Sequence, residues 1–146
     1  MKIDRAVLER AAIACRRGLL KLSGKSGSIF YRFPRGACGP ASEILGRLLK
    51  EEFDYDGVYV CGNDHPQLGR EQSHAWLEVG EFLLDITHDQ FKETGLSGWV
   101  FERGGEWHEL FSDTDTRPGF CAPANWPCYP HDGYQAALAE LSKGAR

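Results

Sequence analysis

Apolar residues recur at helical spacing in three parts of the chain. Residues 4–22 predict a helix that Asp4 caps, with small apolar residues along one face. The segment from about Gly39 to Glu52 carries a leucine-rich stripe, and Pro40 suits its first turn because a missing N–H costs nothing there. Residues 134–143 are short and amphipathic. Three helices are therefore expected.

Runs of strand-forming residues lie between the second and third of these helices. Residues 56–62, "DGVYVCG", predict a compact strand. Residues 73–87, "SHAWLEVGEFLLDIT", predict a hairpin that turns at residues 80–81. Residues 98–111 predict a second hairpin that turns at the glycine pair 104–105.

The remaining segments give weaker signals. The aromatic stretch 29–33, "IFYRF", predicts a short extended segment, and the Pro/Gly-rich residues 113–134 predict an irregular coil over the surface. Helices followed by antiparallel strands indicate an α+β fold. A length of 146 residues fits a single domain, 1–146, around one core.

Composition and charge exclude several classes of protein. The net charge is −4, from 17 bases and 21 acids, and no Lys/Arg block is present, which argues against nucleic acid as a partner. No run approaches the roughly 18 apolar residues of a membrane helix, so no membrane partner is expected. The charged N-terminal segment does not resemble a signal peptide. A cytoplasmic protein is expected, and an exported effector or toxin would look the same.

Cys38 occupies a position that favours a nucleophile. The chain has five cysteines, and an odd, scattered set argues against a disulfide framework. A thiol at a helix N-terminus has a lowered pKa, because free N–H groups and the helix dipole favour the thiolate. The same N–H groups can bind the oxyanion of a tetrahedral intermediate. The alternative is that Cys38 packs as a small apolar residue.

A nucleophilic thiol needs a base and a group that orients the base. Strand alternation puts His74 and Trp76 on one face of the predicted hairpin, and the register places Asp85 near Trp76 and close to His74. Asp85 can accept from one imidazole nitrogen and hold the other toward the thiolate. Alternatively, His74 is a half-exposed strand residue and Asp85 pairs with a turn N–H. Thr87 and Gln90 brace Asp85 or satisfy backbone groups.

Together, "GACGPASEILGRLL", "VYVCG" and "SHAWLEV…FLLDITHDQF" resemble the transglutaminase-like superfamily of papain-like thiol enzymes. The resemblance covers about residues 35–91 and rests on the order, spacing and local context of these segments. It implies Cys38 as the nucleophile, His74 as general base and acid, and Asp85 as the orienting group. It also implies a papain-like α+β core, with the catalytic Cys at the N-terminus of a central helix packed on an antiparallel sheet.

Other cleft residues follow from this interpretation. A glutamine shortly before Cys38, of the kind that papain uses for its oxyanion, is missing from the sequence. The candidates for oxyanion donor are Gln72 and the backbone N–H groups at Cys38 and Gly39. Trp76 walls the cleft or packs in the sheet, and Arg35 attracts an acidic substrate or is simply exposed.

The predicted function is thiol-dependent acyl transfer on an amide through a Cys38 thioester, with water or an amine as acceptor. No cofactor or metal is expected, and a protein or peptide substrate is favoured over a small molecule. One alternative is a non-catalytic binding module on the same fold. Another is acetyl transfer, because "RGAC" also resembles the much longer arylamine N-acetyltransferases. A third is a zinc-stabilised adaptor, and its ligands would come from this set: Cys61, His65, Cys121, Cys128 and His131. His88 and His108 are expected at the surface or in the second hairpin.

Overall fold

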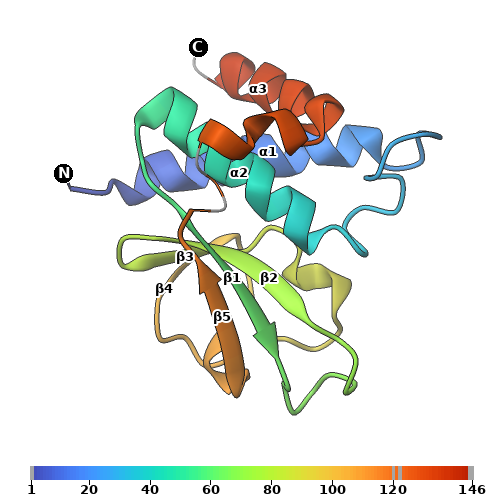
Figure 1. Cartoon of the computed structure of the whole chain (residues 1–146), viewed down its shortest axis with the longest axis vertical. Helices are drawn as coiled ribbons and strands as arrows, with labels where there is room; N and C mark the ends of the chain where they lie inside the picture. The colour runs from blue at the N-terminus through green and yellow to red at the C-terminus, as the bar shows by residue number, and fades with distance from the viewer. Residues whose placement is uncertain (1, 120, 122, 145–146) are drawn as a thin grey trace.

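The chain folds as a layer of helices on one face of an antiparallel sheet (Figure 1). The computed structural model describes residues 2–119, 121 and 123–144. The helices are α1 (Arg5–Leu22), α2 (Cys38–Phe53) and α3 (His131–Gly144). The strands are β1 (Val58–Asn63), β2 (His74–Val79), β3 (Phe82–Leu84), β4 (Val100–Glu102) and β5 (Asp113–Arg117), in the order β4-β3-β2-β1-β5. The predicted α+β class is confirmed.

Helix boundaries follow local chemistry. The Asp4 carboxylate accepts a hydrogen bond from the Ala6 N–H at 2.9 Å and caps α1, as predicted. Helix α2 has no side-chain cap: Ala37 is its N-cap residue, and Cys38 is the first helical residue. This helix ends at Asp54, whose left-handed backbone (φ 56°) stops the helix. The free N-terminus of α2 therefore lies at the thiol.

The β2–β3 hairpin has the predicted register, with Leu77 opposite Leu84 and a tight turn at Gly80. Alternation also holds, because Ala75 and Leu77 face the helices while Trp76 packs on the opposite side of the sheet. Since β3 ends at Leu84, Asp85 leaves the sheet beside the start of β2. This register is what brings Asp85 toward His74.

Two apolar clusters cover the two faces of the sheet. The larger lies between sheet and helices, where α2 packs on β1 and β2 and α3 packs mainly on α1. The smaller lies on the far face and is built from Val60, Trp76, Leu83, Trp107 and Phe111. The far face is therefore closed by the segment around 107–111.

Three local expectations were wrong. Residues 29–33 form turns, because Phe30 and Phe33 are both buried anchors. The second hairpin does not form: β4 pairs with β3, and His108–Leu110 is a 3-10 helix, η2. The segment 113–134 is partly regular, with β5 on the edge of the sheet and the 3-10 helix η3 (Pro123–Cys128) after it. None of the helices described is long and apolar enough to cross a bilayer.

Candidate active site

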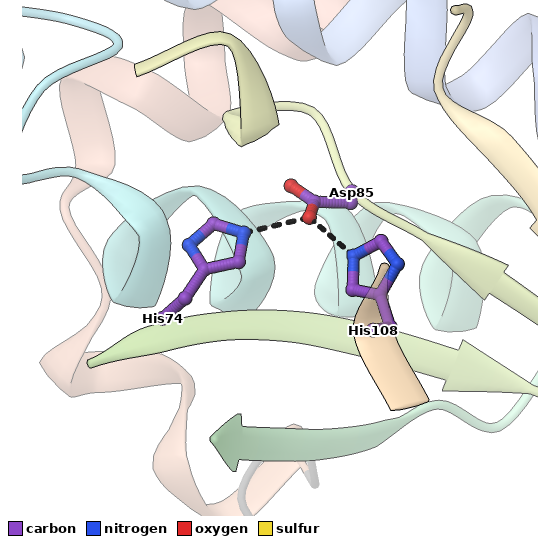
Figure 2. Close-up of side chains that lie close together, drawn as sticks. All are labelled: His74, Asp85 and His108. Atoms are coloured by element: carbon purple, nitrogen blue, oxygen red, sulfur yellow. Dashed lines mark hydrogen bonds and ion pairs between the residues drawn. The ribbon is translucent and has the colours of Figure 1, made fainter. Parts of the chain in front are cut away.

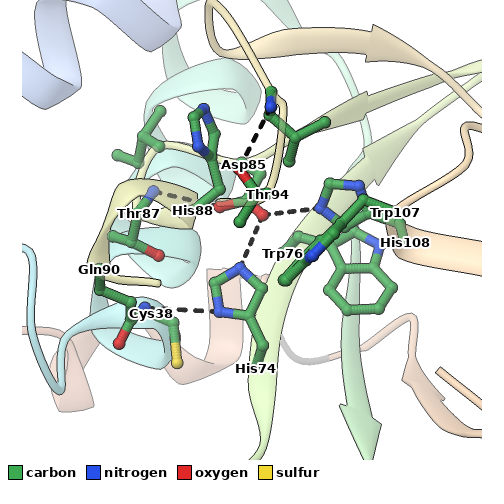
Figure 3. A network of polar contacts seen from close by, with 12 residues as sticks. Cys38, His74, Trp76, Asp85, Thr87, His88, Gln90, Thr94, Trp107 and His108 are labelled. Atoms are coloured by element: carbon green, nitrogen blue, oxygen red, sulfur yellow. Dashed lines mark hydrogen bonds and ion pairs between the residues drawn. The ribbon is translucent and has the colours of Figure 1, made fainter. Parts of the chain in front are cut away.

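The three predicted residues meet where the N-terminus of α2 approaches the start of β2 (Figure 3). His74 Nε2 lies 2.6 Å from Asp85 Oδ2, and both side chains are fully buried. The Cys38 thiol lies beside the His74 side chain, close enough for that ring to lower its pKa, and it remains partly exposed. The structure thus brings together a thiol, an imidazole and a carboxylate from three elements.

The surroundings of Cys38 favour its thiolate. Burial alone would raise the pKa of the thiol, but the hydrogen bond and charge of His74 and the Ala75 N–H lower it. Within α2 the first backbone bond runs from the Ala41 N–H to the Ala37 carbonyl. The N–H groups of Cys38 and Gly39 therefore have no carbonyl partner within the helix.

Polar groups face both ring nitrogens of His74. A carboxylate only accepts, so Nε2 carries the hydrogen that it donates to Asp85. The Gln90 amide lies 3.4 Å from Nδ1. Burial favours a neutral ring, but the charge of Asp85, its hydrogen bond and the Cys38 thiol outweigh burial and raise the pKa of His74 to about 9. A ring of this kind carries a proton near neutral pH.

Asp85 is a buried carboxylate with three donors. Its Oδ1 accepts from the Thr87 N–H at 3.1 Å, and its Oδ2 accepts from His74. Oδ2 also accepts from His108 Nε2 at 2.7 Å (Figure 2). Burial would raise the pKa of Asp85, but the charge of His74 and the hydrogen bonds from His108 and His74 hold it well below its usual range.

The expectation that His108 and His88 lie at the surface or in the second hairpin was wrong. Both are buried, and His88 Nε2 donates to the Gly98 carbonyl at 2.7 Å. His108 follows Trp107, whose ring packs under the sheet and carries the histidine inward. The "GGEWHEL" segment shows no periodicity that marks this position. The sole local signal is the adjacent tryptophan.

Aromatic side chains enclose the His74 ring. Phe91 and Trp107 meet it edge-on, with ring centroids 5.0 and 5.8 Å away, and Phe111 lies 6.4 Å away. Trp76 is 6.0 Å from the ring and nearly fully buried, so it is part of the packed wall. These rings keep water from the imidazole and strengthen its interaction with Asp85.

The turn that presents Gln90 is tied to α1. Arg16 donates to the Ile86 carbonyl at 2.7 Å and to both carboxylate oxygens of Asp89, at 2.8 and 2.6 Å. Its guanidinium also lies over the Trp99 ring at 4.4 Å. The segment 86–90 is therefore fixed from outside the site.

The other predicted cleft residues lie in different environments. Arg35 is exposed in the loop that leads to Cys38, in a hollow of about 550 Å³ lined by residues 32–36. Gln72 Oε1 accepts from the Gly69 N–H at 2.8 Å, within its own loop. Gly39 lies under a residue that the sequence did not single out: a Cβ there would stand 3.1 Å from the Tyr59 hydroxyl.

Among the described residues, His74, Asp85 and His108 form a group whose ligand atoms, within 4.8 Å of one another, could hold a metal ion. Asp85 Oδ2 stands 2.6 and 2.7 Å from the two ring nitrogens. Two ligands of a tetrahedral zinc ion stand about 3.3 Å apart. The spacing therefore fits hydrogen bonds better than shared coordination.

The zinc-adaptor set also has other uses in the structure. His65 Nε2 donates to the Trp107 carbonyl at 2.9 Å, and its Nδ1 accepts from the Gln67 N–H at 3.1 Å. Both nitrogens of this ring are therefore engaged. Cys61 and Cys121 are free thiols, and the side chain of Cys128 lies outside the described residues.

Comparisons with known proteins leave the family open. No family model matches the sequence, and no curated protein matches it. One solved structure, titled "The crystal structure of genomics APC5867", is 15% identical with a TM-score of 0.47. The match covers 96% of this chain and 79% of that one.

Proposed function

We propose that the protein is a thiol acyltransferase or hydrolase that acts on amides through a thioester at Cys38. One observation carries this proposal: the His74 ring is bound by Asp85 at Nε2, and the Cys38 thiol, at a helix N-terminus, lies beside the same ring. A nucleophile, a base and an orienting group in this order are the parts that covalent acyl transfer requires.

The reaction would begin from a thiolate beside a protonated His74. The sulfur of Cys38 attacks the amide carbonyl carbon, and the carbonyl π electrons move to oxygen. As the tetrahedral intermediate collapses, the C–N bond breaks and His74 gives its proton to the departing amine. Water or a second amine then attacks the thioester, with His74 taking its proton, and the thiolate leaves.

The oxyanion would be bound at the first turn of α2. The N–H groups of Cys38 and Gly39 face no carbonyl of their own helix, and the dipole adds positive potential. The Tyr59 hydroxyl, above Gly39, would supply a second donor. Burial raises the pKa of Tyr59 to about 12, and the negative charges of Cys38, Cys61 and Glu43 add to this effect. The hydroxyl therefore keeps its proton near neutral pH. This assigns to Tyr59 the role considered for Gln72.

A protein or peptide would be the substrate, and no cofactor takes part in these steps. The thiol is partly exposed, and the loop that leads to it lines a hollow of about 550 Å³ at residues 32–36, which suits a polypeptide better than a small molecule. The α2 N-terminus packed on an antiparallel sheet also agrees with the papain-like, transglutaminase-like arrangement that the sequence resembles.

Selective alkylation tests the proposal. Iodoacetamide below one equivalent should label Cys38 before Cys15, Cys61 and Cys121, whose pKa values are all raised, chiefly by burial. Peptide mass spectrometry locates the label. His74→Ala should remove the preference, whereas His88→Ala, which changes a buried histidine that is bonded to the Gly98 carbonyl, should keep it.

Acyl transfer itself needs a second readout. Wild-type protein incubated with casein and a fluorescent primary amine should release ammonia or incorporate the amine, and Cys38→Ala should do neither. Selective labelling without turnover on amides would favour a binding module that retains the triad as structure. Equal labelling of the thiols would rule out an activated Cys38.

A further inference from the structure

We propose that His108 is a positioning residue of this site, which keeps the Asp85 carboxylate ionised and turned toward His74. The inference rests on the proposed function, since it assigns a fourth member to the same chain of groups. His108 touches neither the thiol nor a substrate, and it would act through Asp85.

The hydrogen bonds of the buried carboxylate carry the inference. Asp85 is cut off from water, so its charge depends on the groups that donate to it. Oδ1 has the Thr87 N–H, while Oδ2 receives two imidazole N–H groups, from His74 at 2.6 Å and His108 at 2.7 Å. Figure 2 shows the two rings approaching the carboxylate from opposite sides. Without His108, Oδ2 would have His74 alone.

Contacts other than those with His74 also fix the orientation of His108. The preceding Trp107 accepts from His65 Nε2 at 2.9 Å and donates its indole N–H to Gln67 Oε1 at 3.1 Å. The His108 ring then packs edge-on against Trp76, with centroids 4.9 Å apart. A donor held in this way restricts rotation of the Asp85 carboxylate.

Few charges surround His108. Among the described residues, the titratable groups that face its ring are Asp85 and, with ring centroids 6.4 Å apart, His74. The other rings packed against it are those of Trp76, Phe101 and Trp107. The test therefore follows Asp85 and His74, whose pKa values are both shifted in this site.

Loss of the His108 donor should make Asp85 easier to protonate. A neutral Asp85 no longer stabilises the positive charge of a protonated His74. Without that positive charge on His74, the Cys38 thiolate loses the cation that stabilises it. Reactivity of Cys38 would then fail at higher pH than in the wild type. The acid limb of its alkylation profile is thus the readout.

The test compares His108→Phe with His108→Gln, which retains an N–H donor, and with His88→Phe, which changes a buried histidine outside the chain of groups. The rate of Cys38 alkylation by iodoacetamide is followed by mass spectrometry from about pH 4 to about pH 10. In His108→Phe, the pH below which the alkylation rate of Cys38 falls should be roughly one unit higher than in the wild type. At the acidic end of that range, the rate should be about tenfold lower than in the wild type. His108→Gln and His88→Phe should stay within about twofold of wild type.

Two NMR measurements separate this inference from the proposed function. The carboxyl ¹³C titration of Asp85 should shift upward in His108→Phe but not in His108→Gln, even if Cys38 proves unreactive. In the wild type, ¹⁵N shifts should show His108 protonated at Nε2, a readout that needs no variant to fold. An Nδ1–H tautomer, an unmoved Asp85 titration, or a His108→Gln profile that matches His108→Phe would overturn the inference.

Discussion

At the scale of single residues, the proposed role of the Tyr59 hydroxyl can be distinguished from that of the Cys38 thiol by comparing acyl transfer with alkylation. Acyl transfer develops an oxyanion, whereas alkylation by iodoacetamide develops none near α2. Tyr59→Phe should therefore lower acyl transfer by roughly tenfold to a hundredfold and leave Cys38 alkylation unchanged. Steady-state turnover and alkylation rates on the same sample check this prediction.

Gln72→Ala is the matched control for Tyr59→Phe. Its amide oxygen is bonded to the Gly69 N–H, so we expect turnover close to wild type. Loss of turnover in Gln72→Ala with normal turnover in Tyr59→Phe would exchange their roles. Equal loss of turnover and alkylation in Tyr59→Phe would point to a packing defect.

The lowered pKa of Asp85 leads to a prediction of how the free energy of unfolding depends on pH. Its pKa in the folded protein is lowered, so its contribution is complete above the unfolded pKa, near 3.8, and is lost as pH falls toward the folded pKa. Between about pH 4 and about pH 2, the wild type should lose about 2 kcal/mol more free energy of unfolding than Asp85→Asn. Urea unfolding across this range measures the difference. Parallel curves for the two proteins would show that Asp85 is not a low-pKa carboxylate.

The residues of the site divide by whether a local pattern marks them. Cys38 was predictable from its place at a helix start, and His74 and Asp85 from strand alternation and hairpin register. His108 and Tyr59 reach the site through the packing of distant segments. Nothing in the sequence around either residue specifies that packing, so pattern analysis missed both.

At the scale of elements, the sequence predicted the helices and strands that bury one face in the core, because burial of one face produces a regular pattern of apolar residues. The three helices and the β2–β3 hairpin formed as expected, because each buries one face. Strand β5 was missed because all of its residues are exposed at the sheet edge. Its sequence therefore has no alternation of apolar and polar residues that would indicate a strand. The second hairpin does not form because β4 pairs with β3 and not with the segment that follows the glycine pair 104–105.

The loop 23–37 gives the candidate site a cationic border. Phe30 and Phe33 anchor it in the core, and its exposed charges, Lys25, Arg32 and Arg35, are all basic. From residue 10 to residue 42 the chain has no acidic residue, although the net charge of the protein is −4. A border of this kind would favour an acidic stretch of substrate beside the reacting amide.

Two alkylating reagents that differ in charge test this border. Iodoacetate is anionic and iodoacetamide is neutral, so their rate ratio at Cys38 reports local potential and cancels changes in thiol pKa. Arg35→Glu should lower the iodoacetate/iodoacetamide ratio roughly threefold at low salt, and added salt should reduce the difference. Labelling rates from mass spectrometry give the ratio.

Arg17→Glu is the matched control, with the same change of charge on an exposed position of α1. It should leave the ratio within the error of wild type. If Arg17→Glu and Arg35→Glu lower the ratio equally, the effect belongs to net charge, and the loop has no special role.

At the scale of the whole molecule, the site joins all of its layers. Cys38 comes from the helical layer, His74 from the sheet, and His108 from the segment that closes the far face. Their geometry therefore depends on how the layers are held together. Helix α3 contributes none of the site residues named here, and it packs mainly on α1, so this contact can be altered without changing a residue of the site.

At Gly18 the backbones of α1 and α3 lie close together. A Cβ at this position would stand 2.6 Å from backbone atoms of Ala136 and Ala137, and a backbone cannot move aside as a side chain can. Gly18→Ala should therefore lower the free energy of unfolding by about 1–3 kcal/mol in spite of the better helix propensity of alanine. Cys38 alkylation at temperatures where the variant is folded should be normal, because the strain lies between two helices and not at the thiol. Gly144→Ala, at the open end of α3, is the control and should be neutral or slightly stabilising, since nothing lies within 4 Å of the added carbon. Urea unfolding of both variants decides the matter: a Gly18→Ala protein as stable as the wild type would contradict the close packing of α1 on α3.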